Sequence, residues 1–258
     1  MKQANVVLVI PGLDGHPGML AQPAVAEGLW RGLQLVYVDH RQDTAADGLE
    51  GMADRAIRTL DAAVGRQAKA IVCGESFGGT VALVLARRYP ERVAGLVLLS
   101  TFGRYPWPNR VFAQFGLLAW RLLGDTAARV ILHVGRVLGV VAHLGWTPSH
   151  ESLRAYFGHP FPHLAAYRTK CSLLLGLDAR PWLRELHCPT LIVSGAFDPV
   201  VPASASSVLA ASIVRANLHR LRAGHTPHLV QPAEIGQLIA DWLADRLCEP
   251  VEIATDLN

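Results

Sequence analysis

The chain has 258 residues, which is enough for one sizeable hydrophobic core and too short for several ordinary domains. Hydrophobic residues make up 51% and charged residues 17%, a composition that indicates a globular protein. The net charge is only +3 and no basic run of five or more residues occurs, so nucleic acid is not an expected partner.

The N-terminal segment and the cysteines indicate a cytoplasmic protein. The apolar run at residues 6–10 (VVLVI) is shorter than the hydrophobic stretch of a signal peptide. Nowhere are there 18 uninterrupted apolar residues, so we expect no transmembrane helix. Cys73, Cys171, Cys188 and Cys248 lack the spacing of a metal site, and we expect reduced thiols and no bound metal.

Short runs rich in β-branched residues alternate along the chain with longer helical patterns. We predict strands at 6–10, 35–39, 69–73, 94–99, 190–194 and 217–221, and helices near 20–32, near 52–64, at 77–88, near 203–213 and at the C-terminal end. Strands that are apolar throughout and separated by helices are typical of a parallel sheet covered on both faces. The predicted fold class is therefore α/β.

Residues 102–187 interrupt this alternation. The segment is one third of the chain, holds 12 of the 18 aromatic residues, and has ten basic against four acidic side chains. We find no convincing strand in it. We therefore predict a helical insertion at 102–187, between two strands of a core that is formed by residues 1–101 and 188–258.

Within this insertion the sequence predicts a helix over 126–144, capped by Asp125. The helix is apolar except for a narrow polar stripe, so we expect most of its surface to be buried on the core or on a second subunit. The chain would then be a monomer or a homodimer. The alternative is an apolar acyl-binding pocket that includes Phe112, Phe115 and Trp120, with the arginines facing an anionic interface or an amphiphilic substrate.

A serine stands between a predicted strand and a predicted helix in the stretch 73–79 (CGESFGG). It matches the pattern Gly-x-Ser-x-Gly. A serine on so sharp a turn needs strained backbone angles, and Gly74 and Gly78 remove side chains that would clash there. Gly79 lets the helix approach the sheet. We therefore predict that Ser76 is a nucleophile and not a bystander in a glycine-rich turn. Glu75 is expected to point away from the cleft and to be structural.

A serine hydroxyl needs a base, and the base needs an acid that orients it. Asp198 and His225 each follow a predicted strand by a few residues, at the sheet edge where working residues of such folds lie. We predict that they are the acid and the base. His228 lies nearby, but Gly224 would let the loop bend at His225, so substitution of His228 by alanine is expected to be mild.

The loop after the first strand is the candidate site for an oxyanion. Its sequence is PGLDG, at residues 11–15, and its glycines allow a main-chain N–H to point into the site. The N–H groups of Leu13 and Phe77 are the two donors that we expect to stabilise a tetrahedral intermediate.

Together these motifs resemble the α/β-hydrolase superfamily over nearly the whole chain. The resemblance rests on the loop PGLDG, the elbow GESFGG, the acid loop SGAFDPVVP and the terminal GHTPHLVQPAEI. PGLDG with GESFGG is especially similar to bacterial hydrolases akin to the esterase/lipase/thioesterase domain of plant phytyl ester synthases. The resemblance implies about six mostly parallel strands, because the first hairpin of the fold is absent, and it implies that 102–187 is a lid after the sixth core strand.

The residues and the resemblance together predict a serine hydrolase of short- to medium-chain carboxylic esters that needs no cofactor. A thioesterase, an acyltransferase or a C–C bond hydrolase would use the same residues. A non-catalytic ligand-binding protein on the same fold is the alternative of another class. The expected partner is a small-molecule ester, and the lid is a candidate for transient contact with a membrane or lipid interface. His159 and His163 flank Pro-Phe-Pro and are not expected to bind zinc.

Overall fold

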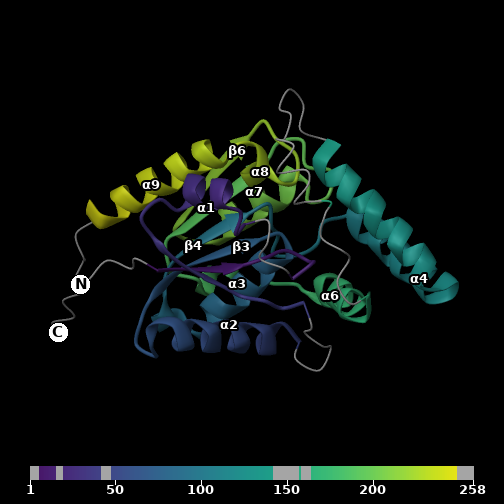
Figure 1. Ribbon diagram of the computed structural model, residues 1–258, viewed down its shortest axis with the longest axis horizontal. Coiled ribbons are helices and arrows are strands. Elements are labelled where there is room, and N and C mark those ends of the chain that lie inside the picture. The colour runs from purple at the N-terminus through teal and green to yellow at the C-terminus, as the bar shows by residue number, and fades with distance from the viewer. Residues whose placement is uncertain (1–5, 16–19, 42–47, 142–156, 158–163, 249–258) are drawn as a thin grey trace.

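The computed structural model describes residues 6–15, 20–41, 48–141, 157 and 164–248 (Figure 1). Its centre is one sheet of six strands in the order β2-β1-β3-β4-β5-β6. The strands are β1 (Val6–Ile10), β2 (Gln34–Tyr37), β3 (Ala70–Glu75), β4 (Val93–Leu99), β5 (Thr190–Gly195) and β6 (Ala216–Leu221). All five pairings are parallel, which confirms the predicted α/β fold.

Helices cover both faces of the sheet because successive strand residues point to opposite sides. Leu8 and Ile10 of β1 face the cluster that also contains residues of α2 (Gly48–Val64), α3 (Phe77–Arg88) and α7 (Ala203–Ser212). Val7 and Val9 face the other cluster, with residues of α1 (Pro23–Leu29) and α9 (Pro232–Cys248). Short elements complete the core: the helix α8 (Pro227–Val230) and the 3₁₀ turns η1 (Pro90–Arg92) and η2 (Leu183–Glu185).

The strand register brings the carboxyl ends of the central strands to one edge. Ile10 of β1 pairs with Gly74 of β3, and Gly74 pairs with Leu98 of β4. Leu98 in turn pairs with Ile192 of β5. The segments that follow β1, β3, β5 and β6 therefore emerge close together, and these are the segments that carry the predicted site residues.

Between β4 and β5, the described part of the chain contains two long helices that lie outside the layers covering the sheet (Figure 1). They are α4 (Asn109–Val141) and α6 (Leu164–Gly176). α4 is broken at Gly124, whose backbone angles are φ 77° and ψ −166°. The helix predicted over 126–144 is the part of α4 beyond this break, and its residues 142–144 lie outside the described residues. Gly124 and not Asp125 has the non-helical backbone there.

Other differences from the predicted elements are small and have local causes. α1 is shorter than the helix expected near 20–32, because Pro23 starts it and the backbone of Trp30 leaves the helical region at φ −130°. No helix in the described part of the chain is long and apolar enough to span a membrane.

The close packing of α3 on β1 generates the first prediction. A Cβ atom on Gly78 would overlap the backbone carbonyl oxygens of Ile10 and Pro11, which cannot rotate away. Gly78→Ala should therefore lower the free energy of unfolding by about 3 kcal/mol. Gly135→Ala is the matched control, because a Cβ on Gly135, in the exposed middle of α4, meets no atom within 4 Å. The control should be neutral or should stabilise by about 1 kcal/mol. Urea unfolding measures both, and equal stability of the two variants would contradict the packing.

Candidate active site

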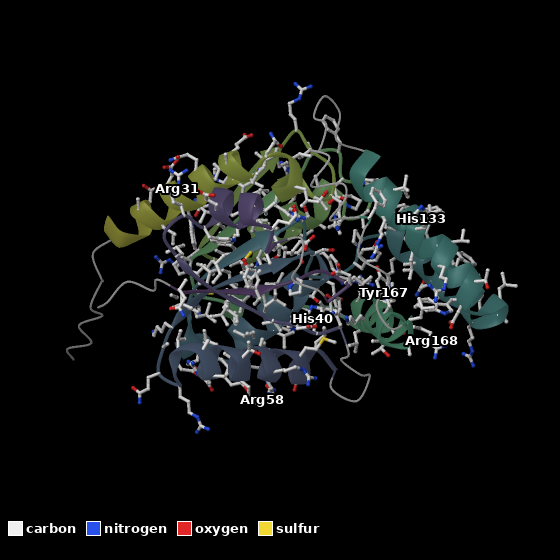
Figure 2. The ribbon with its side chains drawn as sticks, viewed as in Figure 1. Arg31, His40, Arg58, His133, Tyr167 and Arg168 are labelled. Atoms are coloured by element: carbon white, nitrogen blue, oxygen red, sulfur yellow. The ribbon has the colours of Figure 1, made fainter. Side chains whose placement is uncertain are left out.

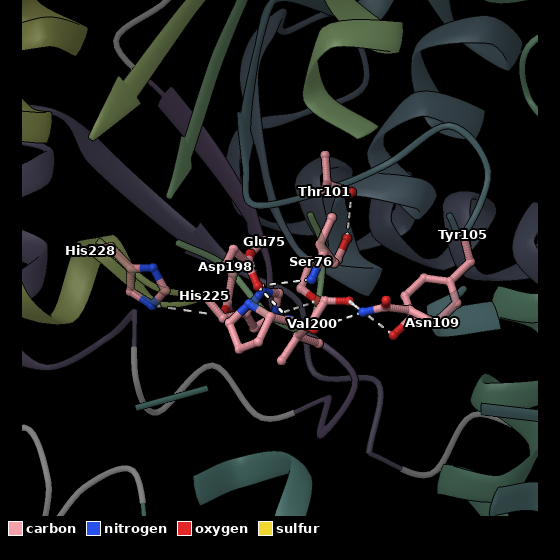
Figure 3. Close-up of polar contacts among 11 residues, drawn as sticks. Glu75, Ser76, Thr101, Tyr105, Asn109, Asp198, Val200, His225 and His228 are labelled. Carbon is pink, nitrogen blue, oxygen red and sulfur yellow. Dashed lines mark hydrogen bonds and ion pairs between the residues drawn. The ribbon is translucent and has the colours of Figure 1, made fainter. Parts of the chain in front are cut away.

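Ser76 occupies the turn between β3 and α3 with a left-handed backbone, at φ 50° and ψ −117°. Such angles are costly for a residue with a side chain and persist only when the surroundings enforce them. Two hydrogen bonds do so here. The Ser76 N–H donates to the carbonyl oxygen of Leu99 at 2.8 Å, and the Thr101 hydroxyl donates to the Ser76 carbonyl oxygen at 2.6 Å (Figure 3). The turn thus fixes the serine side chain at the carboxyl edge of the sheet.

The structure brings Ser76, His225 and Asp198 into one hydrogen-bonded chain (Figure 3). The Oγ of Ser76 lies 3.0 Å from Nε2 of His225, and Nδ1 of His225 lies 2.7 Å from Oδ2 of Asp198. The other carboxylate oxygen, Oδ1, accepts the N–H groups of Val200 and Val201, both at 2.8 Å. With its proton on Nδ1, the imidazole can accept the serine proton on Nε2.

Opposing effects act on the base. Burial of His225 disfavours its charged form, whereas the adjacent carboxylate of Asp198 favours it by charge and by hydrogen bonding. The second effect outweighs the first, so the pKa of His225 is raised above its ordinary value of 6.5. An imidazole with a raised pKa is a stronger proton acceptor, which suits it to a serine hydroxyl.

The loop after β1 is held by three buried side chains from distant parts of the chain. His40 donates from Nε2 to the Pro11 carbonyl oxygen at 2.9 Å. The Gly12 N–H donates to the Glu75 carboxylate at 3.3 Å, and Lys170 of α6 donates to the Leu13 carbonyl oxygen at 3.4 Å. A turn closes the loop through the Gly15 N–H and the Gly12 carbonyl oxygen.

The two candidate oxyanion donors lie at this edge of the sheet. Leu13 belongs to the held loop, between Gly12 and Gly15. Phe77 is the first residue of α3, so its N–H has no acceptor within the helix. Sequence reasoning missed His40 and Lys170. Only a weak signal pointed to Lys170, which is one of three lysines in a chain with 21 arginines.

Glu75 is buried, and the sequence did not predict its partners. One carboxylate oxygen accepts from Gly12, and the other lies 3.7 Å from Nε2 of His228. Burial and the neighbouring Asp14 raise the pKa of Glu75 to about 7, although His225 and the Gly12 N–H favour its charged form. The side chain therefore carries a proton part of the time at neutral pH.

The position of His228 adds an effect on stability that the sequence did not predict. Its replacement by alanine is still predicted to be mild for catalysis, but the side chain is completely buried and faces Glu75 (Figure 3). The helix α8 begins at Pro227 and turns His228 inward. Replacement by alanine would leave a cavity beside a buried carboxyl group, so we now expect a loss of stability of about 2 kcal/mol or more.

The predicted acyl-pocket residues do not share one side of α4. Trp120 is 4% exposed, and its indole N–H donates to Asp125 at 3.1 Å. Phe112 and Phe115 are 73% and 64% exposed and turn away from the core. In the described part of the chain these three side chains therefore line no common pocket. Nor do three His, Cys, Asp or Glu side chains converge there as a metal site would require.

Side chains at the start of the insertion donate hydrogen bonds to backbone carbonyl oxygens of the loop that carries Asp198. Asn109, the first residue of α4, donates to the carbonyl oxygens of Pro199 and Val200 at 2.7 and 3.0 Å. The Tyr105 hydroxyl also donates to Val200, at 3.1 Å (Figure 3). The loop that carries Asp198 is thus tied to the start of α4, much as Lys170 ties α6 to the loop after β1.

Comparison with known proteins gives concordant matches. Residues 5–232 match the family described as alpha/beta hydrolase fold. The pimeloyl-[acyl-carrier protein] methyl ester esterase of Aromatoleum aromaticum is 33% identical over 190 residues, covering 67% of this chain and 73% of that protein. The 2-hydroxymuconate semialdehyde hydrolase of a Pseudomonas species is 33% identical over 204 residues, covering 74% and 67%. A solved hydrolase structure from Pseudomonas aeruginosa has a TM-score of 0.72 at 21% identity, covering 95% and 90%.

The buried carboxyl group generates the second prediction. A pKa raised from 4.5 to about 7 means that the folded protein keeps a proton which the unfolded chain loses between these values. Stability due to Glu75 is therefore fully present below pH 4.5 and is lost as the pH rises to about 7. Glu75→Gln keeps an acceptor for Gly12 and does not titrate.

Relative to wild type, Glu75→Gln should therefore gain about 2 kcal/mol of unfolding free energy between pH 5 and pH 8. Urea denaturation of both proteins at the two pH values measures this gain. Any contact that the substitution removes at every pH lowers stability equally at pH 5 and pH 8, so it cancels when the two differences are compared. A difference that stays constant with pH would mean that the folded protein holds Glu75 ionised throughout.

Proposed function

Because the chain belongs to the alpha/beta hydrolase fold family, we propose that it hydrolyses carboxylic esters through an acyl-enzyme on Ser76. The single observation that carries the proposal is the hydrogen-bonded chain from Ser76 through His225 to Asp198, with heavy-atom distances of 3.0 and 2.7 Å. This order and geometry are those of a nucleophile, its base and the group that orients the base.

In the first half of the reaction, Ser76 Oγ attacks the ester carbonyl carbon while Nε2 of His225 takes the hydroxyl proton. The negative charge that develops on the carbonyl oxygen is stabilised by hydrogen bonds that the N–H groups of Leu13 and Phe77 donate to it. When the tetrahedral intermediate collapses, the imidazolium returns its proton to the departing alkoxide. The alcohol leaves, and the acyl group stays bonded to Ser76.

Water completes the cycle by the same route. His225 takes a proton from the water as its oxygen attacks the acyl carbon, and it gives this proton to Ser76 as the acid departs. Asp198 keeps the imidazole in the required tautomer and stabilises it while it is charged. Apart from the ester and the water, each of these steps uses side chains and N–H groups of this chain.

The substrate class is supported by the relative from Aromatoleum aromaticum, whose name gives it a methyl ester as substrate. We propose esters of short- to medium-chain acids. The relative named as a hydrolase of 2-hydroxymuconate semialdehyde supports a second candidate, hydrolysis of such a semialdehyde by the same three residues. A panel of nitrophenyl esters of increasing acyl length, assayed beside that semialdehyde, separates the two. Turnover of the semialdehyde alone would overturn ester hydrolysis, and a thioesterase would prefer thioesters in the same panel.

The third prediction concerns the nucleophile and the base. Ser76→Ala and His225→Ala should each lower kcat for a nitrophenyl ester by about 10⁶-fold, because the members of a triad act as a unit. The exposed His219→Ala is the matched control and should keep wild-type activity. Thermal unfolding checks that each variant folds. Retention of more than a few per cent of activity by Ser76→Ala would refute the assignment, and so would the absence of ester turnover by wild type.

The fourth prediction follows from the raised pKa of His225. Only the neutral imidazole accepts a proton, so kcat/KM should fall as the pH drops through that pKa, with a midpoint above 6.5. Asp198→Asn removes the charge that raises the pKa, so the midpoint should move down and kcat should fall by about 10⁴-fold. A profile that stays flat down to pH 5 would exclude a histidine base.

A further inference from the structure

α4 exposes apolar side chains where an ordinary surface helix exposes polar ones. Ten of the fifteen large hydrophobic residues exposed in the described structure belong to α4, among them Phe112, Phe115, Leu122, Val130, Val134 and Leu138. Leu122 is 72% and Val130 is 61% exposed. The helix predicted over 126–144 is therefore not buried on the core as far as Leu138, and its burial on a second subunit stays a prediction.

The side of α4 that faces the rest of the protein is also apolar, and its side chains are buried or partly buried. Trp120 and Ala128 are buried, and Leu117 packs against the main core cluster. Within each half of α4, before and after the break at Gly124, the exposed apolar residues follow a spacing of three or four and so form an outward stripe. The two halves lie against each other, because a Cβ atom on Gly116 would be 3.6 Å from the side chain of Ile131. We call the two stripes together, represented by the six residues named above, the α4 face. In Figure 1, α4 is the teal segment that stands apart from the layers of the core.

The charged side chains of α4 itself are nearly all of one sign. α4 contains Arg110, Arg121, Arg129 and Arg136, and its one acidic residue, Asp125, accepts the indole N–H of Trp120. A second copy of the chain on this face would bring arginines against arginines, which opposes association. An apolar stripe bordered by arginines suits a surface that offers hydrocarbon beneath negative charge.

A groove beside the α4 face also combines apolar side chains with arginines. It lies between α4 and α6, has a volume of about 450 Å³, and is lined by Leu117, Leu118, Arg121, Arg168 and Ser172. Figure 2 shows Arg168 on α6, next to α4. The two guanidinium groups can bind phosphate oxygens, while the leucines contact the hydrocarbon attached to them. The Ser172 hydroxyl donates to the carbonyl oxygen of Arg168 at 3.1 Å.

We propose that the α4 face binds the surface of an anionic phospholipid membrane, with the groove between α4 and α6 receiving a lipid phosphate. The apolar side chains enter the boundary between headgroups and acyl chains, and Arg121, Arg129 and Arg168 interact with the phosphates. This binding does not depend on the proposed ester hydrolysis. It adds a place at which that chemistry would meet amphiphilic substrates.

Co-sedimentation with vesicles tests the proposal. The full chain is mixed with vesicles of phosphatidylcholine alone, or of phosphatidylglycerol and phosphatidylcholine at one to three. It should bind the anionic vesicles at least about tenfold more strongly, and raised salt should weaken the binding. Glycerol phosphate is added as a soluble competitor. It should displace the protein poorly, because the apolar contacts need a membrane.

Two variants separate charge from apolar contact. Arg121→Glu with Arg129→Glu should lower binding to anionic vesicles by tenfold or more. Phe112→Ser with Leu122→Ser should lower it similarly while the charge is kept. The matched charge control is Arg31→Glu with Arg58→Glu, on sides of the molecule away from α4 (Figure 2). The matched apolar control is Val208→Ser with Val214→Ser. Both controls should bind like wild type.

Several results would overturn the proposal. One is equal binding to both kinds of vesicle, or to neither. Another is equal loss in the control variants, which would indicate attraction by overall charge. If glycerol phosphate bound the groove while vesicles did not, the site would serve a soluble phosphate. If size-exclusion chromatography showed a dimer that Phe112→Ser with Leu122→Ser dissociates, without vesicle binding, the α4 face would be a subunit interface. Since each readout is binding, failure here leaves the test of Ser76 unaffected.

Discussion

The left-handed backbone of Ser76 is the constraint on which the rest of the site depends. At φ 50° the chain reverses direction within one residue, so α3 starts directly against β1 and leaves no room for a side chain at Gly78. The two hydrogen bonds that hold Ser76 come from Leu99, the last residue of β4, and from Thr101, which follows β4. The turn at Ser76 is therefore bonded directly to the neighbouring strand. Because the parallel register aligns the strand ends, His225 and Asp198 then reach the serine from the segments after β6 and β5.

A buried polar layer beneath the site holds the loop after β1. Glu75, His40 and Lys170 contact consecutive backbone groups of this loop, and removing such groups from water costs free energy that only specific partners offset. Burial and, to a lesser degree, the positive charge of Lys170 lower the pKa of His40 to about 3, so this side chain stays neutral and acts as a donor. Since Lys170 and Asn109 come from the insertion, the insertion stabilises two loops of the site while exposing the α4 face.

The sequence predicted the sheet well because apolar, β-branched runs between helical patterns have few other interpretations. It also indicated which residues would meet at the strand ends, since parallel strands end at one edge. It could not show that Lys170 reaches Leu13 from 157 residues away, or that α8 turns His228 into the core, because both depend on tertiary packing. Nor could the apolar composition of α4 distinguish burial within one chain from an exposed face, since both require the same residues.

The measurement that tests the central claim most directly is covalent labelling with a serine-reactive alkyl phosphonate, followed by mass spectrometry of the peptides. The strained turn and the paired imidazole should make Ser76 far more nucleophilic than any other serine of the chain. We therefore expect one adduct per molecule, on Ser76, formed in step with the loss of esterase activity and absent from Ser76→Ala. Complete inactivation with the adduct on another residue, or full activity after quantitative labelling of Ser76, would contradict the account.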